Sequence, residues 1–448
     1  GLAFYRFNLR LDRSIASHCC SPAHHAACHE LMRAPLHGAK PYVRVLQTGQ
    51  PDLFRTGLEV FLIVDGIDEA TLQLLRTHGF DQELCSRWQA LLRELPGVER
   101  FNCLKAGVEP LGSGEIRLLP SSDSIERRRL TEVGLQAFAR GEVGAVVLAG
   151  GMATRFGGVV KALAPVVESQ TFLDFKLSDV RSCSERARRT LPVFLMTSFG
   201  SDALLHQAAR QFRNSGMNVQ TFCQFISLRL TEDGALFRTQ DGSLSPYAPG
   251  HGDLPAALRK SGLLDAFMSN GGRYLCVSNV DNLTATLDPA IVGAHIECGA
   301  AVTVEVVKKA CGDQGGAPAR VGGVPQIVET FRFPNEFDQD AIPVFNTNTM
   351  TMTASALDQD FALSWFLVRK TVEGRTAIQF ERLIGELTAY LPTQFLQVER
   401  TGLDSRFQPV KSPEELAQRI PEILKALQAR NSMQALPMDA CVDEVGSA

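Results

Sequence analysis

The sequence lacks any apolar run that approaches the roughly 20 residues of a membrane-spanning helix. It also lacks the apolar core of a signal peptide near its first residues, so we expect a cytoplasmic protein without a membrane partner. Neither sign of charge dominates, because 45 Lys and Arg stand against 49 Asp and Glu, a formal net charge of −4. General nucleic-acid binders are usually basic, so we expect no nucleic-acid partner.

The cysteines show no disulfide framework. Eleven are scattered along the chain, which is typical of reduced thiols in a cytosol. The exception is HCCSPAHHAACHE, residues 18–30, which is rich in both His and Cys. This segment is either a metal site or part of a disordered tail that precedes the folded domain. Its spacing matches no established zinc knuckle, which favours the tail.

Hydrophobic periodicity divides the N-terminal part of the chain. Residues 1–45 show no sustained period and are predicted to be a disordered tail. Residues 46–135 are predicted to be a small, mostly helical region, because Trp88 and several leucines share one face of a helix that Asp81 can cap.

From residue 136 to 411, short apolar runs alternate with segments of helical period. This alternation predicts crossover units, hence an α/β fold with a mostly parallel, Rossmann-like sheet and helices on both faces. Within it, residues 253–272 and 376–391 are each expected to form one helix. Residues 326–334 and 343–352 are expected to add antiparallel strands.

Residues 412–448 are predicted to be a helical C-terminal tail. The tail begins with a capping box, in which Ser412 caps the helix and Glu415 stands three residues later. Pro421 should kink or split this helix, because proline removes a backbone donor and clashes with the preceding turn.

One strand is expected to end in a glycine turn followed by cations. The stretch VVLAGGMATRFGGVVK, residues 146–161, is apolar up to Gly150 and Gly151 and then carries Arg155 and Lys161. Glycine lets backbone N–H groups approach a ligand, and the two cations suit phosphate oxygens. The stretch is neither a Walker loop nor a clean dinucleotide fingerprint. By itself it leaves two interpretations open, a phosphate site and a tight turn with surface cations.

Six polar segments at or near expected strand ends carry a family resemblance. They resemble, in order, motifs of the UDP-sugar pyrophosphorylase family, with most similarity to its UTP–glucose-1-phosphate uridylyltransferase branch. The segments are residues 146–161, PGHGD (249–253), SNVDNL (278–283), VFNTNT (344–349), IQFERLIG (378–385) and RFQPVK (406–411). Two positions depart from the family pattern: Ala153 replaces its third glycine and Val160 the proline before its lysine.

The resemblance implies that residues 136–411 are a nucleotidyltransferase domain. In this family an oxygen of a sugar-1-phosphate attacks the α-phosphorus of UTP, and pyrophosphate leaves. The substrates implied are UTP and a sugar-1-phosphate, most similar to glucose-1-phosphate, and the implied cofactor is Mg²⁺. The nucleophile is already ionised at neutral pH, so the reaction needs no Ser-His dyad, and none is visible. The sequence leaves the oligomeric state open.

Carried over position by position, the resemblance implies a set of site residues. The catalytic cations would be Arg155, Lys161 and Lys411, and Asp281 would bind Mg²⁺ beside the phosphates. The other nucleotide-binding residues would be Leu148, Ala149, Gly150, Gly151, Gln224 and Gly250. The sugar-binding residues would be His251, Asn279, Glu329, Asn346 and Asn348.

Other functions remain as alternatives. A UDP-N-acetylglucosamine or a broad-specificity UDP-sugar pyrophosphorylase would share the fold and the chemistry, although VFNTNT favours glucose. A non-catalytic sugar-nucleotide binding protein is suggested by Ala153 and Val160. A dinucleotide-binding dehydrogenase is disfavoured, because no acidic residue ends the next expected strand.

Overall fold

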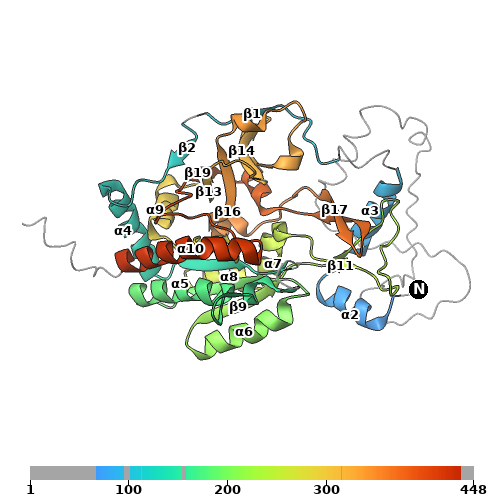
Figure 1. Cartoon of the computed structure of the whole chain (residues 1–448), viewed down its shortest axis with the longest axis horizontal. Coiled ribbons are helices and arrows are strands. Elements are labelled where there is room, and N and C mark those ends of the chain that lie inside the picture. The colour runs from blue at the N-terminus through green and yellow to red at the C-terminus, as the bar shows by residue number, and fades with distance from the viewer. Residues whose placement is uncertain (1–66, 95–100, 113, 154–157, 314, 435–448) are drawn as a thin grey trace, which may run out of the picture. The chain divides into compact units, whose positions relative to one another are not determined.

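The computed structural model describes residues 67–94, 101–112, 114–153, 158–313 and 315–434 (Figure 1). These residues all belong to one compact unit, residues 57–448. The predicted tail at 1–45, with its Cys/His-rich segment, lies outside the described residues.

An eight-stranded sheet forms the centre of this unit, in the order β2-β19-β13-β16-β12-β3-β8-β9 (Figure 1). Five of its seven pairings are parallel, and β16 is antiparallel to both neighbours. The mostly parallel sheet predicted from the sequence is therefore confirmed. The strands are β2 (Ile116–Leu118), β3 (Val143–Leu148), β8 (Pro192–Thr197), β9 (Asn218–Cys223), β12 (Tyr274–Asn279), β13 (Val302–Lys308), β16 (Val344–Thr353) and β19 (Thr393–Gln397).

Alternating side chains of the strands build cores on both faces of the sheet. Val146 and Phe194 pack with α7 (Leu254–Lys260) and α8 (Leu263–Ser269). Val147 belongs to a second cluster, with helices on the other face. The helices of that other face are α4 (Ile125–Ala139), α5 (Phe172–Ala187), α6 (Asp202–Asn214), α9 (Pro289–Cys298) and α10 (Pro413–Gln434).

None of the helices in the described part of the chain is long and apolar enough to cross a membrane.

The region expected to be helical and N-terminal contains α2 (Glu69–Thr77) and α3 (Gln82–Glu94). Asp81 accepts a hydrogen bond of 2.8 Å from Leu84 N, as its predicted role as a cap requires. The same region also supplies β2, an edge strand of the central sheet. In addition it supplies β1 (Val108–Pro110), which pairs with β14 (Gly316–Val321). The boundary at residue 135 stays a prediction.

The helix expected at residues 376–391 is wrong. The chain forms β18 (Arg375–Glu381), which pairs with β17 (Phe366–Val372), followed by a 3-10 helix at Ile384–Ala389. Phe380 is buried and stacks on Trp88 at a centroid distance of 4.6 Å. Tertiary burial of an extended segment has overridden a helical local pattern.

Two other helix expectations need correction. Residues 253–272 form α7 and α8 rather than one helix, because Gly262 between them has φ +74°. Pro421 does not split α10, which runs unbroken from Pro413 to Gln434. The antiparallel strand expected at 343–352 is confirmed as β16. The strand expected at 326–334 is confirmed only up to Glu329, as β15 (Val324–Glu329), because Thr330–Arg332 form a 3-10 helix.

Candidate functional site

The ends of four strands of the sheet meet at one edge. Asn279, the last residue of β12, pairs with Leu148, the last of β3. Leu148 also pairs with Met196 of β8, whose Thr197 pairs with Cys223 of β9. The glycine turn, SNVDNL and Gln224 therefore all leave the sheet at the same edge, which is where open parallel sheets bind ligands.

Gly150 leaves room for the side chain of Gln224. A Cβ on Gly150 would lie 2.3 Å from Gln224 Nε2, closer than any real contact. The Oε1 of Gln224 is buried and has no hydrogen-bond partner among the described residues. A buried acceptor without a donor is costly, so this amide is suited to a ligand that supplies an N–H group.

Lys161 contacts three segments near the carboxyl ends of the strands. Its Nζ donates to the carbonyl oxygen of Val410 and lies 3.8 Å from Oδ2 of Asp281. Its backbone N donates to Gly151 O at 3.1 Å, and Val410 N donates to Asp281 O at 3.1 Å. The glycine turn, SNVDNL and RFQPVK, far apart in sequence, thus meet at one lysine.

Lys411 follows Val410 directly and is exposed. Its backbone N donates to Glu415 Oε2 at 2.7 Å, at the start of α10. Burial raises the pKa of the Asp281 carboxyl, and the ammonium groups of Lys161, Lys176 and Lys411 oppose that rise. These three cations therefore favour the charged form of the Asp281 carboxyl.

Asn282 fixes the segment that leads to Lys411. Its Nδ2 donates to Arg406 O and its Oδ1 accepts from Gln408 N, both at 3.0 Å. Asn282 is 1% exposed. Because its amide already bonds two backbone groups, Asn282 has a structural role and holds this segment against the SNVDNL turn.

VFNTNT forms an irregularity in β16 opposite Glu305 of β13. Asn348 has φ +58°, and its backbone N is held by Asn346 Oδ1 at 3.0 Å. The bulge turns the Asn348 amide toward β12, where it donates to Asn279 Oδ1 at 3.0 Å. Three of the predicted sugar-binding residues are thus brought together.

PGHGD packs against the end of β18. Gly250 has φ +104°, and a Cβ there would lie 2.7 Å from Arg382 O. His251 Nδ1 accepts a 3.0 Å hydrogen bond from Ile384 N. Burial lowers the His251 pKa to about 4, against the influence of Glu381. The ring is therefore neutral, and its Nε2–H remains to donate.

Glu329 ends β15, in the sheet that includes β14. It lies by the same 3-10 helix that binds His251, because a Cβ on Gly385 would be 3.8 Å from Glu329 Oε1. Burial raises the pKa of Glu329 to about 7, with Arg332 opposing. A carboxyl at this end of β15 is thus poised between its two forms near neutral pH.

The loop between Gly151 and Lys161 is described only in part. Arg155 lies outside the described residues. Ala153 pairs with Val159 in a short hairpin of β4 (Met152–Ala153) and β5 (Val159–Val160). The two departures from the family pattern therefore stand in extended strands.

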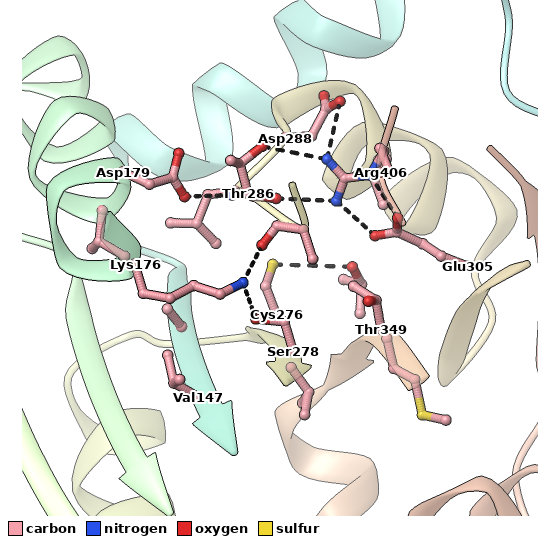
Figure 2. A pocket seen from close by; sticks show the side chains of 18 residues that line it. Val147, Lys176, Asp179, Cys276, Ser278, Thr286, Asp288, Glu305, Thr349 and Arg406 are labelled. Carbon is pink, nitrogen blue, oxygen red and sulfur yellow. Dashed lines mark hydrogen bonds and ion pairs between the residues drawn. The ribbon is translucent and has the colours of Figure 1, made fainter. Parts of the chain in front are cut away.

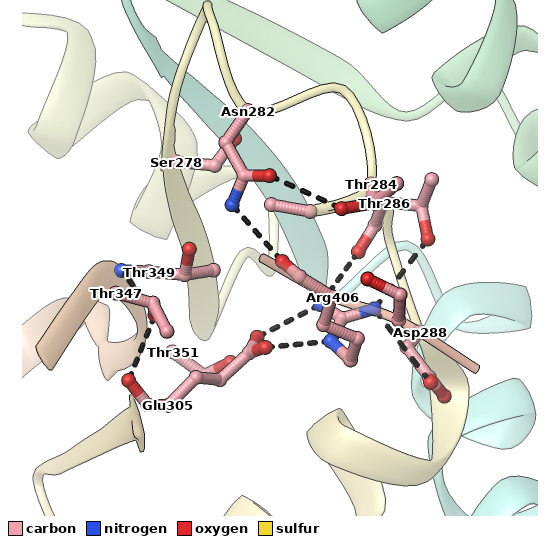
Figure 3. Close-up of polar contacts among 12 residues, drawn as sticks. Ser278, Asn282, Thr284, Thr286, Asp288, Glu305, Thr347, Thr349, Thr351 and Arg406 are labelled. Atoms are coloured by element: carbon pink, nitrogen blue, oxygen red, sulfur yellow. Dashed lines mark hydrogen bonds and ion pairs between the residues drawn. The ribbon is translucent and has the colours of Figure 1, made fainter. Parts of the chain in front are cut away.

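A buried polar cluster lies beneath the SNVDNL turn, and no local pattern assigned a role to its members (Figure 3). Arg406 makes a two-pronged ion pair with Glu305, at 2.5 and 2.8 Å, and donates to Thr286 O at 3.0 Å. Arg430 of α10 donates to Thr284 O at 2.6 Å. Arg406 belongs to RFQPVK, but its neighbours lie in separate segments that only the fold brings together.

The chain resembles known proteins in both sequence and fold. Residues 102–434 match the family described as UTP–glucose-1-phosphate uridylyltransferase. UTP–glucose-1-phosphate uridylyltransferase 2 of Dictyostelium discoideum is 29% identical over 287 residues, 60% of this chain and 56% of that protein. The potato (Solanum tuberosum) enzyme named UTP–glucose-1-phosphate uridylyltransferase is 30% identical over 285 residues, 60% of this chain and 59% of that protein. The chain thus covers less than two thirds of the length of these relatives.

Solved structures show the same fold. The UDP-N-acetylglucosamine pyrophosphorylase of Trypanosoma brucei superposes with a TM-score of 0.62 and 20% identity, over 79% of this chain and 85% of that one. The UDP-glucose phosphorylase of the same organism gives a TM-score of 0.61 and 22% identity, over 78% and 77%. Since the family match spans most of the described residues, the chain belongs to the UTP–glucose-1-phosphate uridylyltransferase family.

Proposed function

We propose that this chain transfers the uridylyl group of UTP to a sugar-1-phosphate, preferring glucose-1-phosphate, and releases pyrophosphate. The observation that carries the proposal is the meeting of Lys161, Asp281 and the Val410–Lys411 segment at the edge where the strands end. Family membership supports the same reaction.

The chain's part in the reaction is to position and neutralise charge. A phosphate oxygen of the sugar-1-phosphate forms a bond to the α-phosphorus, and the bond to the β-phosphate oxygen breaks. Negative charge gathers on the transferring group, so fixed cations stabilise the transition state. Lys161 is already fixed by Val410 and Asp281, and Lys411 approaches from the exposed side. We assign Arg155 to the triphosphate by family likeness alone.

The uridine side of the site would be built from the glycine turn. Leu148, Ala149, Gly150 and Gly151 would lie along the nucleotide, and Gln224 would read the uracil edge. The unpartnered Oε1 of Gln224 supports this, because the uracil N3–H is a donor of the kind it lacks. Gly250 would also contact the base.

Asp281 has the chemistry that Mg²⁺ requires. Mg²⁺ binds through one or two carboxylates, with substrate phosphates and waters as its other ligands. The Asp281 side chain is 25% exposed, so a ligand can reach it. The described residues hold no group of three or more acidic, His and Cys side chains that could bind a metal, so Mg²⁺ would take most of its ligands from the substrate and from water. When bound, the ion would supply further neutralisation of phosphate charge.

Sugar recognition would use His251, Glu329, Asn279, Asn346 and Asn348. The neutral His251 can donate from Nε2, and the three asparagines offer amides at the β12–β16 junction. Directed polar groups of this kind discriminate between sugars better than apolar contact, because a wrong sugar leaves them unpaired.

The test is pyrophosphate release from UTP with glucose-1-phosphate, N-acetylglucosamine-1-phosphate and galactose-1-phosphate in turn, with and without Mg²⁺. We expect Mg²⁺-dependent turnover that is fastest with glucose-1-phosphate. Faster turnover with the amino sugar, or equal rates with all three sugars, would contradict the proposed preference for glucose-1-phosphate but not the proposed reaction. UDP-glucose binding without pyrophosphate release from any of them would instead indicate a non-catalytic binding protein.

A further inference from the structure

One lysine stands in the apolar stripe of α5. Phe172, Leu173, Leu177 and Val180 are buried at helical spacing, and Lys176 lies among them at 4% exposure. A buried ammonium group costs folding free energy unless it is paired, so its partners indicate what it does.

The Lys176 ammonium bridges the two arms of the loop that carries Asp281 (Figure 2). It donates to Ser278 Oγ at 3.0 Å, where β12 is about to end, and to Ala285 O at 2.8 Å, where the loop returns. Asp281 lies between these two attachment points in sequence. The distance between the arms is therefore fixed by one side chain from another element.

Asp179, one turn further along α5, holds the same loop at a third point. Its Oδ2 accepts from Leu287 N at 2.8 Å. The Lys176 and Asp179 side chains point into a cavity of about 30 Å³ that Ser278 and Thr286 also line (Figure 2). Such a volume admits about one water molecule, so the loop is supported by protein atoms from below.

The Lys176 side chain faces the carboxylates of Asp179, Asp281 and Glu305, and burial lowers its pKa to about 7. Lys176 therefore acts on Asp281 through the shape of the loop, because its two hydrogen bonds hold the arms on either side of that residue.

We propose that Lys176 is a positioning residue for Asp281, which sets the geometry of the loop that binds the metal–nucleotide complex. The proposal rests on the proposed function, in which Asp281 holds Mg²⁺. Lys176 touches no substrate, so its loss should change the metal requirement more than the turnover at saturating metal.

The experiment measures Mn²⁺ binding to the full chain with UTP and no sugar-1-phosphate, by electron paramagnetic resonance of free Mn²⁺. The variant is Lys176→Met, which keeps the length of the side chain and removes its charge and donors. We expect the Kd for Mn²⁺ to rise about tenfold, while kcat at saturating Mg²⁺ falls less than about threefold.

The matched control is Arg181→Met, which removes a cation from an exposed position of the same helix and should leave the Kd unchanged. If Lys176→Met does not fold, Ser278→Ala removes one attachment and should raise the Kd about threefold. Unchanged Kd values in the folded variants would overturn the proposal. Wild-type protein that binds Mn²⁺ with UTP but makes no UDP-sugar would count against the proposed function alone. Wild-type protein that binds no Mn²⁺ would overturn both.

Discussion

Asp281 Oδ2 lies 3.8 Å from Lys161 Nζ, at the point where SNVDNL and the end of the glycine loop meet. Asp281→Asn should lower pyrophosphate release at fixed Mg²⁺ at least about a hundredfold, because the amide is a weak Mg²⁺ ligand. Stability should hold, since the substitution leaves the backbone bond from Val410 N in place. Adding EDTA should abolish wild-type turnover. Asp265→Asn, at an exposed position of α8, is the control and should behave as wild type.

Lys411 is exposed and directly follows Val410, whose backbone N donates to Asp281 O. Lys411→Ala should lower kcat at least about a hundredfold, because the transition state loses charge stabilisation. Lys425→Ala, on an exposed position of α10, is the control. Equal turnover in both variants would remove Lys411 from the mechanism.

Gly150 and Gln224 pack closely across the strand ends. In Gly150→Ala the new methyl group must displace the Gln224 amide, so KM for UTP should rise about tenfold with little change in kcat. Steady-state kinetics at varied UTP measure the split. Gly107→Ala meets no atom within 4 Å and is the control. A loss confined to kcat would contradict the uracil role of Gln224.

Glu329 gives the site a dependence on pH. Its pKa rises from 4.5 to about 7 on folding, so the protonated form is favoured in the native state. The associated stability is present below pH 4.5 and is lost as pH rises through 7, by about 3 kcal/mol at most. Urea unfolding of wild type against Glu329→Gln should show that difference. The control Glu336→Gln, at an exposed position, should show the same change of the free energy of unfolding with pH as wild type.

The same ionisation should appear in substrate binding. A carboxylate accepts sugar hydroxyls better than a carboxylic acid does. KM for glucose-1-phosphate should therefore rise more steeply below about pH 7 in wild type than in Glu329→Gln, in which only the substrate phosphate still titrates, with a pKa of about 6. Parallel profiles in the two proteins would show that Glu329 does not bind the sugar.

Arg406 and Glu305 form an ion pair in which both side chains are nearly fully buried. Arg406→Met should lower the free energy of unfolding by about 3–5 kcal/mol, because Glu305 is left charged and unpaired. Adding Glu305→Gln should recover part of that loss, and urea unfolding of the three proteins measures it. Equal loss in the single and double variants would mean that Arg406 stabilises through its contact with Thr286.

Local patterns predicted the parallel sheet because its strands are apolar runs with little ambiguity. β3, for example, is buried along five of its six residues. Where the pattern fitted two structures the prediction failed, as at Phe380, whose partner Trp88 lies far away in sequence. The helical pattern also continues through Gly262, although the positive φ of that residue separates two helices.

The site was predictable in its motifs and not in its supports. The glycine turn, Asp281 and Lys411 stand in short polar segments that the sequence displays directly. Lys176 occupies a position with the spacing of a core residue, which was a usable signal, but its partners Ser278 and Ala285 lie beyond any local window. Buried ion pairs between distant segments can be predicted only once the fold is known.

β16 links two parallel groups of strands in the central sheet, β12-β3-β8-β9 on one side and β13-β19-β2 on the other. Synthesis from the N-terminus makes β12 and β13 before Val344–Thr353. Until then both strands expose an open edge, and open edges pair readily with other chains. Misassembly in the cell should therefore be most frequent for nascent chains paused before this strand emerges.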